Sequence, residues 1–230
     1  MTSHVRDGVR SAWRHTEVAQ NLPRRAVLFI EWQLRKAEDT LIDRRFRRRG
    51  LATAGPTFSG FDATTEIRGY VPTDYRVLRT LFPAGSLRED DVLLEYGSGK
   101  GRVVMWIASR FPLRRVIGVE LDRDLSIAAE ESLRRWTEPM RCADVEFECT
   151  DARSFEVPDD VSVVYLFNPF MGRTFDATLA KLHESLARRP RPLRVIYFFP
   201  IMHSALIDSG FTVERNKKHE LYAWATYSIG

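Results

Sequence analysis

The chain has 230 residues, of which 44% are hydrophobic, so it has enough apolar material for a sizeable core and global disorder is excluded. No run of about 18 apolar residues occurs, which argues against a membrane-spanning helix. With only two cysteines and no secretory-signal pattern, the composition predicts neither a disulfide framework nor a zinc site, and it indicates a cytoplasmic protein.

The net charge of +4 is distributed unevenly along the chain. Residues 1–60 hold 12 Lys and Arg against 6 Asp and Glu, so this segment carries +6 and the remainder carries −2. Because the basic character is confined to the N-terminal segment, the sequence does not favour a general nucleic-acid binder.

The N-terminal segment is expected to be helical over residues 10–49. Apolar residues from Val27 to Ile42 recur at three- and four-residue spacing, as on one face of a helix. Asn21 and Pro23 are typical of the start of this main helix.

The next segment, residues 50–69, is rich in Gly, Thr, Ser and Pro and is predicted to be a loop. A short helix is expected at about 73–82, before the pattern changes near residue 90. We therefore divide the chain into a basic helical extension with its loop, residues 1–69, and a second domain, residues 70–230.

From residue 90 onward, short β-branched runs alternate with helical patterns, which predicts a parallel sheet covered by helices on both faces. The last two strands have almost nothing between them, which predicts an antiparallel hairpin. The expected fold is α/β, with a Rossmann-like seven-stranded sheet of five parallel strands plus the C-terminal antiparallel hairpin, and with an N-terminal helical extension. The expected strands are 92–96, 115–120, 145–150, 161–167, 193–199, 211–219 and 221–229, and the expected helices are about 101–110, 122–136, 173–188 and 201–209.

A glycine-rich loop follows the first strand, in the sequence Glu95-Tyr96-Gly97-Ser98-Gly99-Lys100-Gly101-Arg102. Glycines let the backbone turn and approach a ligand closely, and the helix behind the loop offers free N–H groups. These features suit a dinucleotide and the carboxylate of S-adenosylmethionine (SAM) equally well. However, Arg102 stands where the motif G-x-G-x-x-G needs Gly, and the Walker pattern is absent. The Glu95 carboxylate would repel a pyrophosphate but suits the sulfonium and ammonium groups of SAM.

Further polar residues follow the next strands in order. Glu120 ends the second strand, where its carboxylate can accept hydrogen bonds from ribose hydroxyls, as acids in dehydrogenases also do. Asp151 follows the third strand and is a candidate acceptor for an adenine amine, with a turn or helix N-cap as the alternative. Asn168-Pro169-Phe170 follows the fourth. Because open α/β sheets bind ligands at the carboxyl ends of their strands, we expect these residues to meet at one site.

The order E-x-G-x-G-x-G, a strand ending in Glu, then D-A, then N-P-F resembles class I SAM-dependent methyltransferases over about residues 70–230. The resemblance implies a transferase that uses SAM as its cofactor, and it implies no metal. The residues that it places at the cofactor are Thr73, Glu95, Gly97, Ser98, Gly99, Gly101, Glu120, Leu121, Asp151, Ala152 and Asn168.

A narrower resemblance involves Tyr70-Val71-Pro72-Thr73, which is followed by a helix and then by G-S-G-x-G-R. It is similar to seven-strand protein-lysine methyltransferases, in which this segment folds over SAM. The likeness implies that Tyr70 and Thr73 line the cofactor site. Lys100 departs from that group, which commonly has Asp there, and we expect Lys100 and Arg102 to be solvated charges.

Three residues are candidates for the reacting groups. Asn168 can accept an N–H of the methyl acceptor and orient its lone pair, Phe170 can pack over the site or against the sulfonium, and Tyr70 lies in the segment before the first strand. The motif is one proline short of the [DN]-P-P-[YF] of amide and nucleobase methyltransferases. His203 is a candidate general base for an oxygen nucleophile, with a polar surface residue as the alternative.

The function predicted from these residues is N-methylation of a protein or peptide amine such as lysine. The alternatives are a small-molecule N- or O-methyltransferase and a non-catalytic SAM- or nucleotide-binding module, while Arg102 disfavours a dinucleotide oxidoreductase. The expected partner is a protein, peptide or small-molecule acceptor, and nucleic acid is not favoured. The N-terminal helices are a candidate substrate lid, a packing or oligomer contact, or, through Arg44–Arg49, a site for acidic partners.

Overall fold

A computed structural model describes residues 24–51, 70–217 and 223–230 of the chain. Its contacts divide the chain into two units, Met1–Ile42 and Asp43–Gly230. Helix α3 (Arg24–Arg47) spans this division, so the last turn of the helix belongs with the second unit. The start expected for this helix at Asn21 and Pro23, and the domain boundary expected after residue 69, lie outside the described residues.

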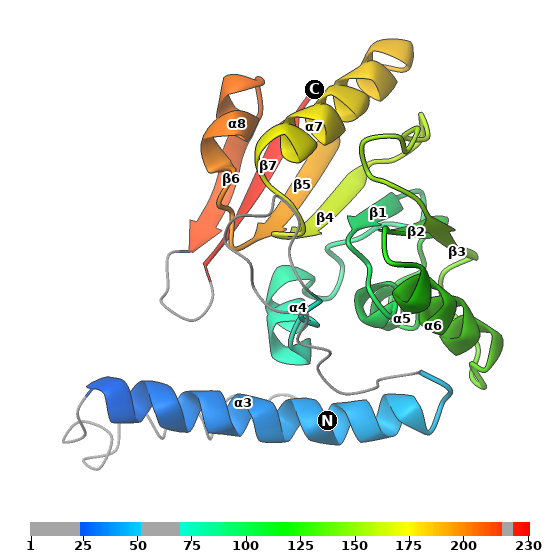
Figure 1. Ribbon diagram of the computed structural model, residues 1–230, viewed down its shortest axis with the longest axis vertical. Coiled ribbons are helices and arrows are strands. Elements are labelled where there is room, and N and C mark those ends of the chain that lie inside the picture. Colours follow the sequence, from blue (N-terminus) through cyan, green and yellow to red (C-terminus); the bar gives the residue numbers. More distant parts are fainter. Residues whose placement is uncertain (1–23, 52–69, 218–222) are drawn as a thin grey trace. The chain divides into compact units, whose positions relative to one another are not determined.

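The second unit contains the predicted seven-stranded sheet, in the order β3-β2-β1-β4-β5-β7-β6 (Figure 1). The first five strands are parallel, and β7 pairs antiparallel with both β5 and β6. This arrangement confirms the Rossmann-like fold expected from the alternation of strand and helix patterns. The strands are β1 (Val92–Tyr96), β2 (Arg115–Glu120), β3 (Asp144–Cys149), β4 (Val163–Phe167), β5 (Leu193–Phe198), β6 (Thr212–Lys217) and β7 (Trp224–Ile229).

The helices of this unit follow the expected pattern to within a few residues. They are α4 (Tyr75–Leu81), α5 (Arg102–Ala108), α6 (Arg123–Arg134), α7 (Gly172–Arg188) and α8 (His203–Asp208). Helix α6 begins where Asp122 caps it, because its carboxylate accepts the backbone N–H groups of Asp124 and Leu125. Within the described residues, no helix is long and apolar enough to cross a membrane.

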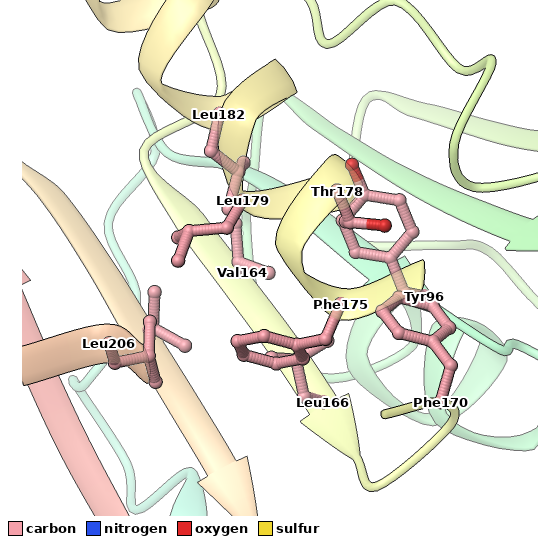
Figure 2. A pocket seen from close by; sticks show the side chains of 10 residues that line it. Tyr96, Val164, Leu166, Phe170, Phe175, Thr178, Leu179, Leu182 and Leu206 are labelled. Atoms are coloured by element: carbon pink, nitrogen blue, oxygen red, sulfur yellow. The ribbon is translucent and has the colours of Figure 1, made fainter. Parts of the chain in front are cut away.

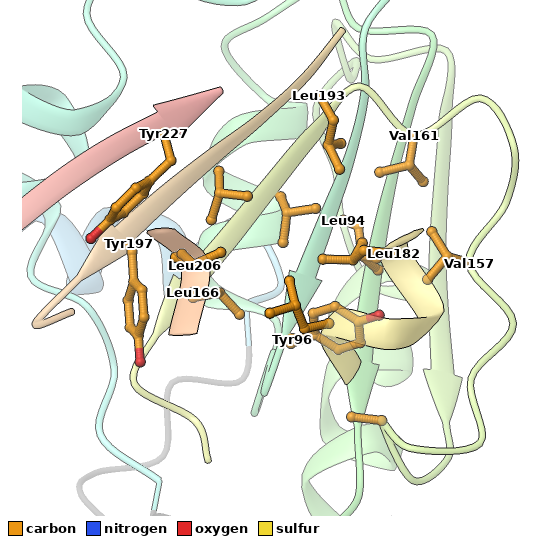
Figure 3. Packing of buried hydrophobic residues seen from close by; sticks show 14 of the residues in the cluster. Leu94, Tyr96, Val157, Val161, Leu166, Leu182, Leu193, Tyr197, Leu206 and Tyr227 are labelled. Atoms are coloured by element: carbon orange, nitrogen blue, oxygen red, sulfur yellow. The ribbon is translucent and has the colours of Figure 1, made fainter. Parts of the chain in front are cut away.

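One face of the sheet packs against α7 and α8 to form a continuous apolar core. Alternate residues of the central strands point into it, as the period of two in a β-strand requires. Figure 3 shows Leu94 and Tyr96 of β1, Leu166 of β4 and Tyr197 of β5 among the side chains of this cluster. The carboxyl edge of the sheet is therefore held by a rigid, close-packed layer.

A small apolar cavity of about 10 Å³ lies inside this core, between α7 and the sheet (Figure 2). Phe170, Phe175 and Leu179 contribute to its lining. This volume is about the smallest that can hold one water molecule, and its apolar walls would offer that water few hydrogen-bond partners. We therefore regard the cavity as a packing defect of the core, separate from the polar edge of the sheet.

The opposite face of the sheet packs against α4 and α5. Phe82, directly after α4, makes an edge-to-face contact with Tyr165 of β4, with ring centroids 5.5 Å apart. Trp106 of α5 and Tyr75 of α4 are fully buried on the same side. The residues before β1 are thus part of this layer, which brings the Tyr70–Asp74 segment to the carboxyl edge of the sheet.

Candidate active site

The glycine-rich loop lies between two segments that are distant in the sequence. Gly97 has a backbone φ of +72°, and a Cβ there would lie 2.7 Å from Cβ of Pro169. Gly99 has a φ of +55°, and a Cβ there would overlap the Tyr70 ring. The loop therefore needs glycine at these positions, because the backbone is left-handed and because Pro169 and Tyr70 leave no room for a Cβ. The N-P-F motif and the Tyr70–Asp74 segment meet at this loop.

The Glu120 side chain turns from the end of β2 toward the same loop. One carboxylate oxygen accepts the backbone N–H of Gly99 at 2.7 Å, and the other accepts that of Asp122 at 2.9 Å. Burial raises the pKa of Glu120, while these N–H groups lower it in part. The carboxylate predicted to hold a ribose thus lies at the expected edge, and it also fixes the loop.

Glu95 is the most deeply buried acid of the site, with 4% of its surface exposed. Burial and, after it, the nearby Glu120 carboxylate raise the pKa of Glu95 well above its ordinary value. The backbone N–H of Val104 in α5 acts in the opposite direction. One Glu95 oxygen, Oε2, is buried without a hydrogen-bond partner within the described residues. Glu95 is therefore a buried acid with an unsatisfied oxygen and a second acid, Glu120, close enough to affect its pKa.

The Tyr70–Asp74 segment is fixed over the loop by buried polar contacts. Thr73 Oγ1 and Tyr165 Oη lie 2.9 Å apart in a hydrogen bond between the segment and β4. The Tyr70 ring lies beside Gly99, and the ammonium of Lys100 is 5.7 Å from its centroid. Burial raises the pKa of Tyr70 to about 12, so its hydroxyl stays protonated at neutral pH. Tyr70 thus lies beside the glycine loop and Thr73 is tied to β4, while their contact with a cofactor stays a prediction.

Arg102 is buried, which corrects the expectation of a solvated charge. Its guanidinium donates to Asp43 Oδ2 at 2.8 Å and to the Thr73 carbonyl oxygen at 3.3 Å. It also lies 4.8 Å from the centroid of the Tyr75 ring, whose hydroxyl donates to Asp43 Oδ1 at 3.0 Å. Lys100 is likewise 8% exposed instead of solvated. Arg102 therefore ties the Tyr70–Asp74 segment to α5 and to the end of α3.

The residues predicted to contact adenine lie just after the ends of β2 and β3. Asp151 accepts three hydrogen bonds from the Arg153 guanidinium and one from the Arg153 backbone N–H, and the guanidinium lowers the pKa of Asp151. The carboxylate thus forms the turn that was the alternative interpretation, while it remains at the carboxyl edge. Leu121 is 49% exposed, so its side chain can cover a bound ring, and Ala152 is buried in the core.

Asn168 lies at the end of β4 in a strained backbone conformation, with a φ of +42°. Such strain in a non-glycine residue is typical of functional sites. Its Oδ1 lies 3.5 Å from the hydroxyl of Tyr197 on β5, at the long limit of a hydrogen bond. Phe199, at the end of β5, also has a positive φ of +52°, and its ring lies 6.1 Å from that of Phe167. Asn168 thus follows Phe167 directly in the chain and contacts the hydroxyl of Tyr197.

Two other sequence candidates have structural roles. Phe170 is 5% exposed and packs in the core, with its ring centroid 5.8 Å from that of Tyr96, so we assign it to packing beneath Asn168 instead of contact with the sulfonium. His203 Nδ1 lies 2.7 Å from the hydroxyl of the buried Tyr227. That hydrogen bond ties His203 to a buried residue of β7, so the structure does not favour His203 as a general base.

The known proteins most informative about this site are methyltransferases. Residues 93–192 match a family model described as a methyltransferase domain. The matched segment includes the glycine loop, Glu120, Asp151 and Asn168, on the seven-stranded sheet described above. Residues 93–192 are therefore similar to a methyltransferase domain, which we call the methyltransferase domain of this chain. The match and the seven-stranded sheet agree with the class I SAM-dependent methyltransferase that the order of motifs predicted.

Individual relatives of the methyltransferase domain have different acceptors. A protein-lysine N-methyltransferase of Saccharolobus islandicus is 32% identical over 53 residues, 23% of this chain and 33% of that protein. A probable ribosomal RNA small subunit methyltransferase A of Methanopyrus kandleri is 33% identical over 97 residues, 42% of this chain and 32% of that protein. This chain therefore spans about a third of the length of the curated relatives that it matches.

Solved structures support the fold of the methyltransferase domain. An RNA methyltransferase from Salinibacter ruber, in complex with S-adenosyl-L-homocysteine, aligns with a TM-score of 0.51 at 24% identity. The alignment covers 69% of this chain and 94% of that structure. At this identity the likeness establishes the arrangement of strands and helices, which agrees with the topology above.

The residues of the methyltransferase domain fit SAM, the cofactor of its superfamily. Glu95 Oε2 and Ser98 Oγ are buried polar atoms with no partner among the described residues, and unmet buried polar atoms of this kind are rare. Gly97 and Gly99 leave the loop backbone without side chains. A cationic ligand would offset the repulsion between Glu95 and Glu120, which a dinucleotide pyrophosphate would increase.

Four residues of the site were missed or misjudged in the sequence. Arg102 was expected in solvent, and no motif indicated Asp43, Tyr165 or Tyr197. Their partners are 29 to 92 residues away in the chain, so no local spacing reveals them. The sequence did contain one indication: Arg102 stands where the motif G-x-G-x-x-G has its third glycine, which could have suggested a buried arginine.

Proposed function

We propose that the protein transfers a methyl group from SAM to a nitrogen atom of an acceptor. The observation that supports the proposal most directly is the glycine loop with Glu95 and Glu120 on one side and Asn168 on the other, all at the carboxyl edge of the sheet. The Tyr70–Asp74 segment covers this loop through the Thr73–Tyr165 and Arg102 contacts.

The cofactor-holding roles follow from the charges and hydrogen-bonding groups. Glu120 would accept hydrogen bonds from the ribose, and Leu121 and Asp151 would lie along the adenine. Glu95 and Glu120 would balance the positive charge of the amino-acid part. When bound, SAM supplies an already activated methyl group, so the protein chiefly has to align the groups and exclude water.

Asn168 would hold the acceptor nitrogen. Its carboxamide oxygen can accept an N–H, which orients the nitrogen lone pair away from that bond, and Tyr197 limits the rotation of the amide. The rings of Phe167 and Phe199 would form the wall of the acceptor site. No general base is required if the acceptor arrives as a neutral amine, which a poorly solvated site favours.

The sequence favours a protein or peptide amine such as lysine as the acceptor. The likeness of the Tyr70–Thr73 segment to protein-lysine methyltransferases and the 53-residue similarity to one of them support this class. A small molecule is the second candidate. The cytoplasmic location and an oligomer contact through the N-terminal helices remain predictions from composition and pattern.

The test of the role of Asn168 is an Asn168→Gly variant. Glycine accepts the φ of +42° without strain, so stability should be kept or slightly raised while the carboxamide is lost. We expect turnover to fall by about 10²-fold or more with unchanged SAM affinity, as for the loss of a group that orients a nucleophile. Tritiated SAM incubated with cell lysate provides the acceptor, and label in protein, RNA and small-molecule fractions is counted separately. Unchanged labelling by the variant would refute the role.

A further inference from the structure

A cluster of arginines lies on a buried aromatic platform away from the methyl-transfer site. The platform consists of Phe46 in the last turn of α3 and Trp106 of α5, both 1% exposed. The Arg110 guanidinium carbon lies 4.7 Å from the Trp106 ring centroid and 5.4 Å from that of Phe46. Arg49 lies 5.9 Å from the Phe46 centroid. Rigid rings thus fix the positions of two exposed or half-exposed guanidinium groups.

The charges around Arg110 are of one sign. Besides burial, the groups that lower the pKa of Arg110 to about 10 are the cations Arg79, Arg45 and Arg49, while the Tyr75 hydroxyl acts in the opposite sense. Arg49 is ion-paired with Glu138 at 2.7 Å.

Within the described part of the chain, no ion pair is found for Arg45 or Arg110; the Arg45 side chain is exposed, and the Arg110 guanidinium is partly covered by the Trp106 and Phe46 rings. The neighbouring like charges repel Arg110, and a bound polyanion would relieve this repulsion.

The cluster is also at a useful distance from the proposed active site. Arg102 opens α5 at the glycine loop, and Arg110 lies just beyond the end of the same helix. The seven residues of α5 span about 10 Å at about 1.5 Å per residue. A nucleic-acid strand covers that distance in about three nucleotides at about 3.4 Å each.

We propose that Arg45, Arg49 and Arg110 form a docking surface for the phosphates of RNA. A guanidinium that lies flat on a ring keeps its N–H edge for a phosphate, to which it can donate two parallel hydrogen bonds. The evenly spaced phosphates of a nucleic-acid strand can pair with several neighbouring cations at once. This docking surface goes beyond the proposed methyl transfer, and it does not depend on which nitrogen atom accepts the methyl group.

The test measures binding of a fluorescein-labelled, mixed-sequence 20-nucleotide single-stranded RNA by anisotropy, without SAM, over 50–300 mM salt. The double variant Arg45→Gln with Arg110→Gln should weaken binding about tenfold at 100 mM salt and reduce the slope of log K against log salt by about 1.4. The charge-keeping variant Arg45→Lys with Arg110→Lys should retain most of the affinity.

A matched control removes two exposed arginines elsewhere, Arg134 in α6 and Arg189 after α7, and is expected to leave the binding unchanged. Thermal unfolding shows that each variant is folded. An equal loss in the control, no RNA binding by the unaltered chain at 50 mM salt, or equal binding of poly-glutamate would overturn the proposal. Because the assay contains no SAM, these outcomes are separate from a failure of methyl transfer, which SAM titration and the lysate labelling detect.

Discussion

Removal of the Arg102 guanidinium tests whether one buried cation holds the segment that covers the glycine loop. In the substitution Arg102→Met, the Asp43 carboxylate and the Thr73 carbonyl lose their donors, while the aliphatic volume is largely kept. Breaking a buried ion pair by removing one partner costs about 3–5 kcal/mol. Since the Asp43 side chain is 18% exposed and keeps the Tyr75 hydroxyl, we expect the free energy of unfolding to fall by about 2–4 kcal/mol.

The loss should be accompanied by weaker SAM binding, because the Tyr70–Asp74 segment is no longer anchored to α5. Urea denaturation gives the stability, and calorimetric titration gives the affinity. A double-mutant cycle with Asp43→Asn should show a coupling energy of about 1–3 kcal/mol. The control Arg134→Met breaks an exposed pair with Glu130 and should change stability by less than about 0.5 kcal/mol. A similarly small change for Arg102→Met, or no coupling to Asp43, would refute the reasoning.

Three further predictions concern the loop and its two carboxylates. Burial and Glu120 raise the pKa of Glu95 above 4.5, so the folded state keeps a proton on Glu95 that the unfolded state loses. The unaltered chain should therefore lose stability relative to Glu95→Gln as the pH rises above about 4.5. A stability difference in urea denaturation that does not change between about pH 5 and 8 would be inconsistent with this. Gly99→Ala should abolish SAM binding by displacing Tyr70, whereas Gly85→Ala, with a φ of +77° and open space around it, should cost about 1–2 kcal/mol of stability and leave SAM affinity unchanged. Glu120→Ala should weaken SAM binding by about 1–3 kcal/mol in calorimetric titration, and an unchanged Kd would remove its assignment to the ribose.

The parallel sheet was predictable because each strand and helix is encoded by residues adjacent in the chain. The alternation of β-branched runs and helical patterns gave all seven strands to within a few residues. The positions of Glu120, Asp151 and Asn168 followed from the same pattern, since the carboxyl ends of parallel strands share one edge. The local sequence therefore contained the fold class and the placement of these three residues at one edge of the sheet.

The roles of individual side chains were less predictable because they depend on distant partners. A surface charge is the usual expectation for an arginine that follows a glycine loop. Arg102 is buried instead, and its guanidinium pairs with Asp43, which lies 59 residues earlier in the chain. Phe170 stands next to Asn168 in the sequence, but successive residues after β4 point in different directions, and its ring enters the core beside Tyr96. The arginine cluster on Phe46 and Trp106 combines two helices that no sequence window contains together.

The central claim is that the glycine loop, Glu95 and Glu120 bind SAM. Isothermal titration calorimetry of the full chain with SAM, S-adenosylhomocysteine and NAD tests it most directly. We expect saturable one-to-one binding of SAM and S-adenosylhomocysteine with Kd values below about 100 μM, or about −5.5 kcal/mol, and no binding of NAD. Binding of NAD, or no heat of binding with millimolar SAM, would contradict it.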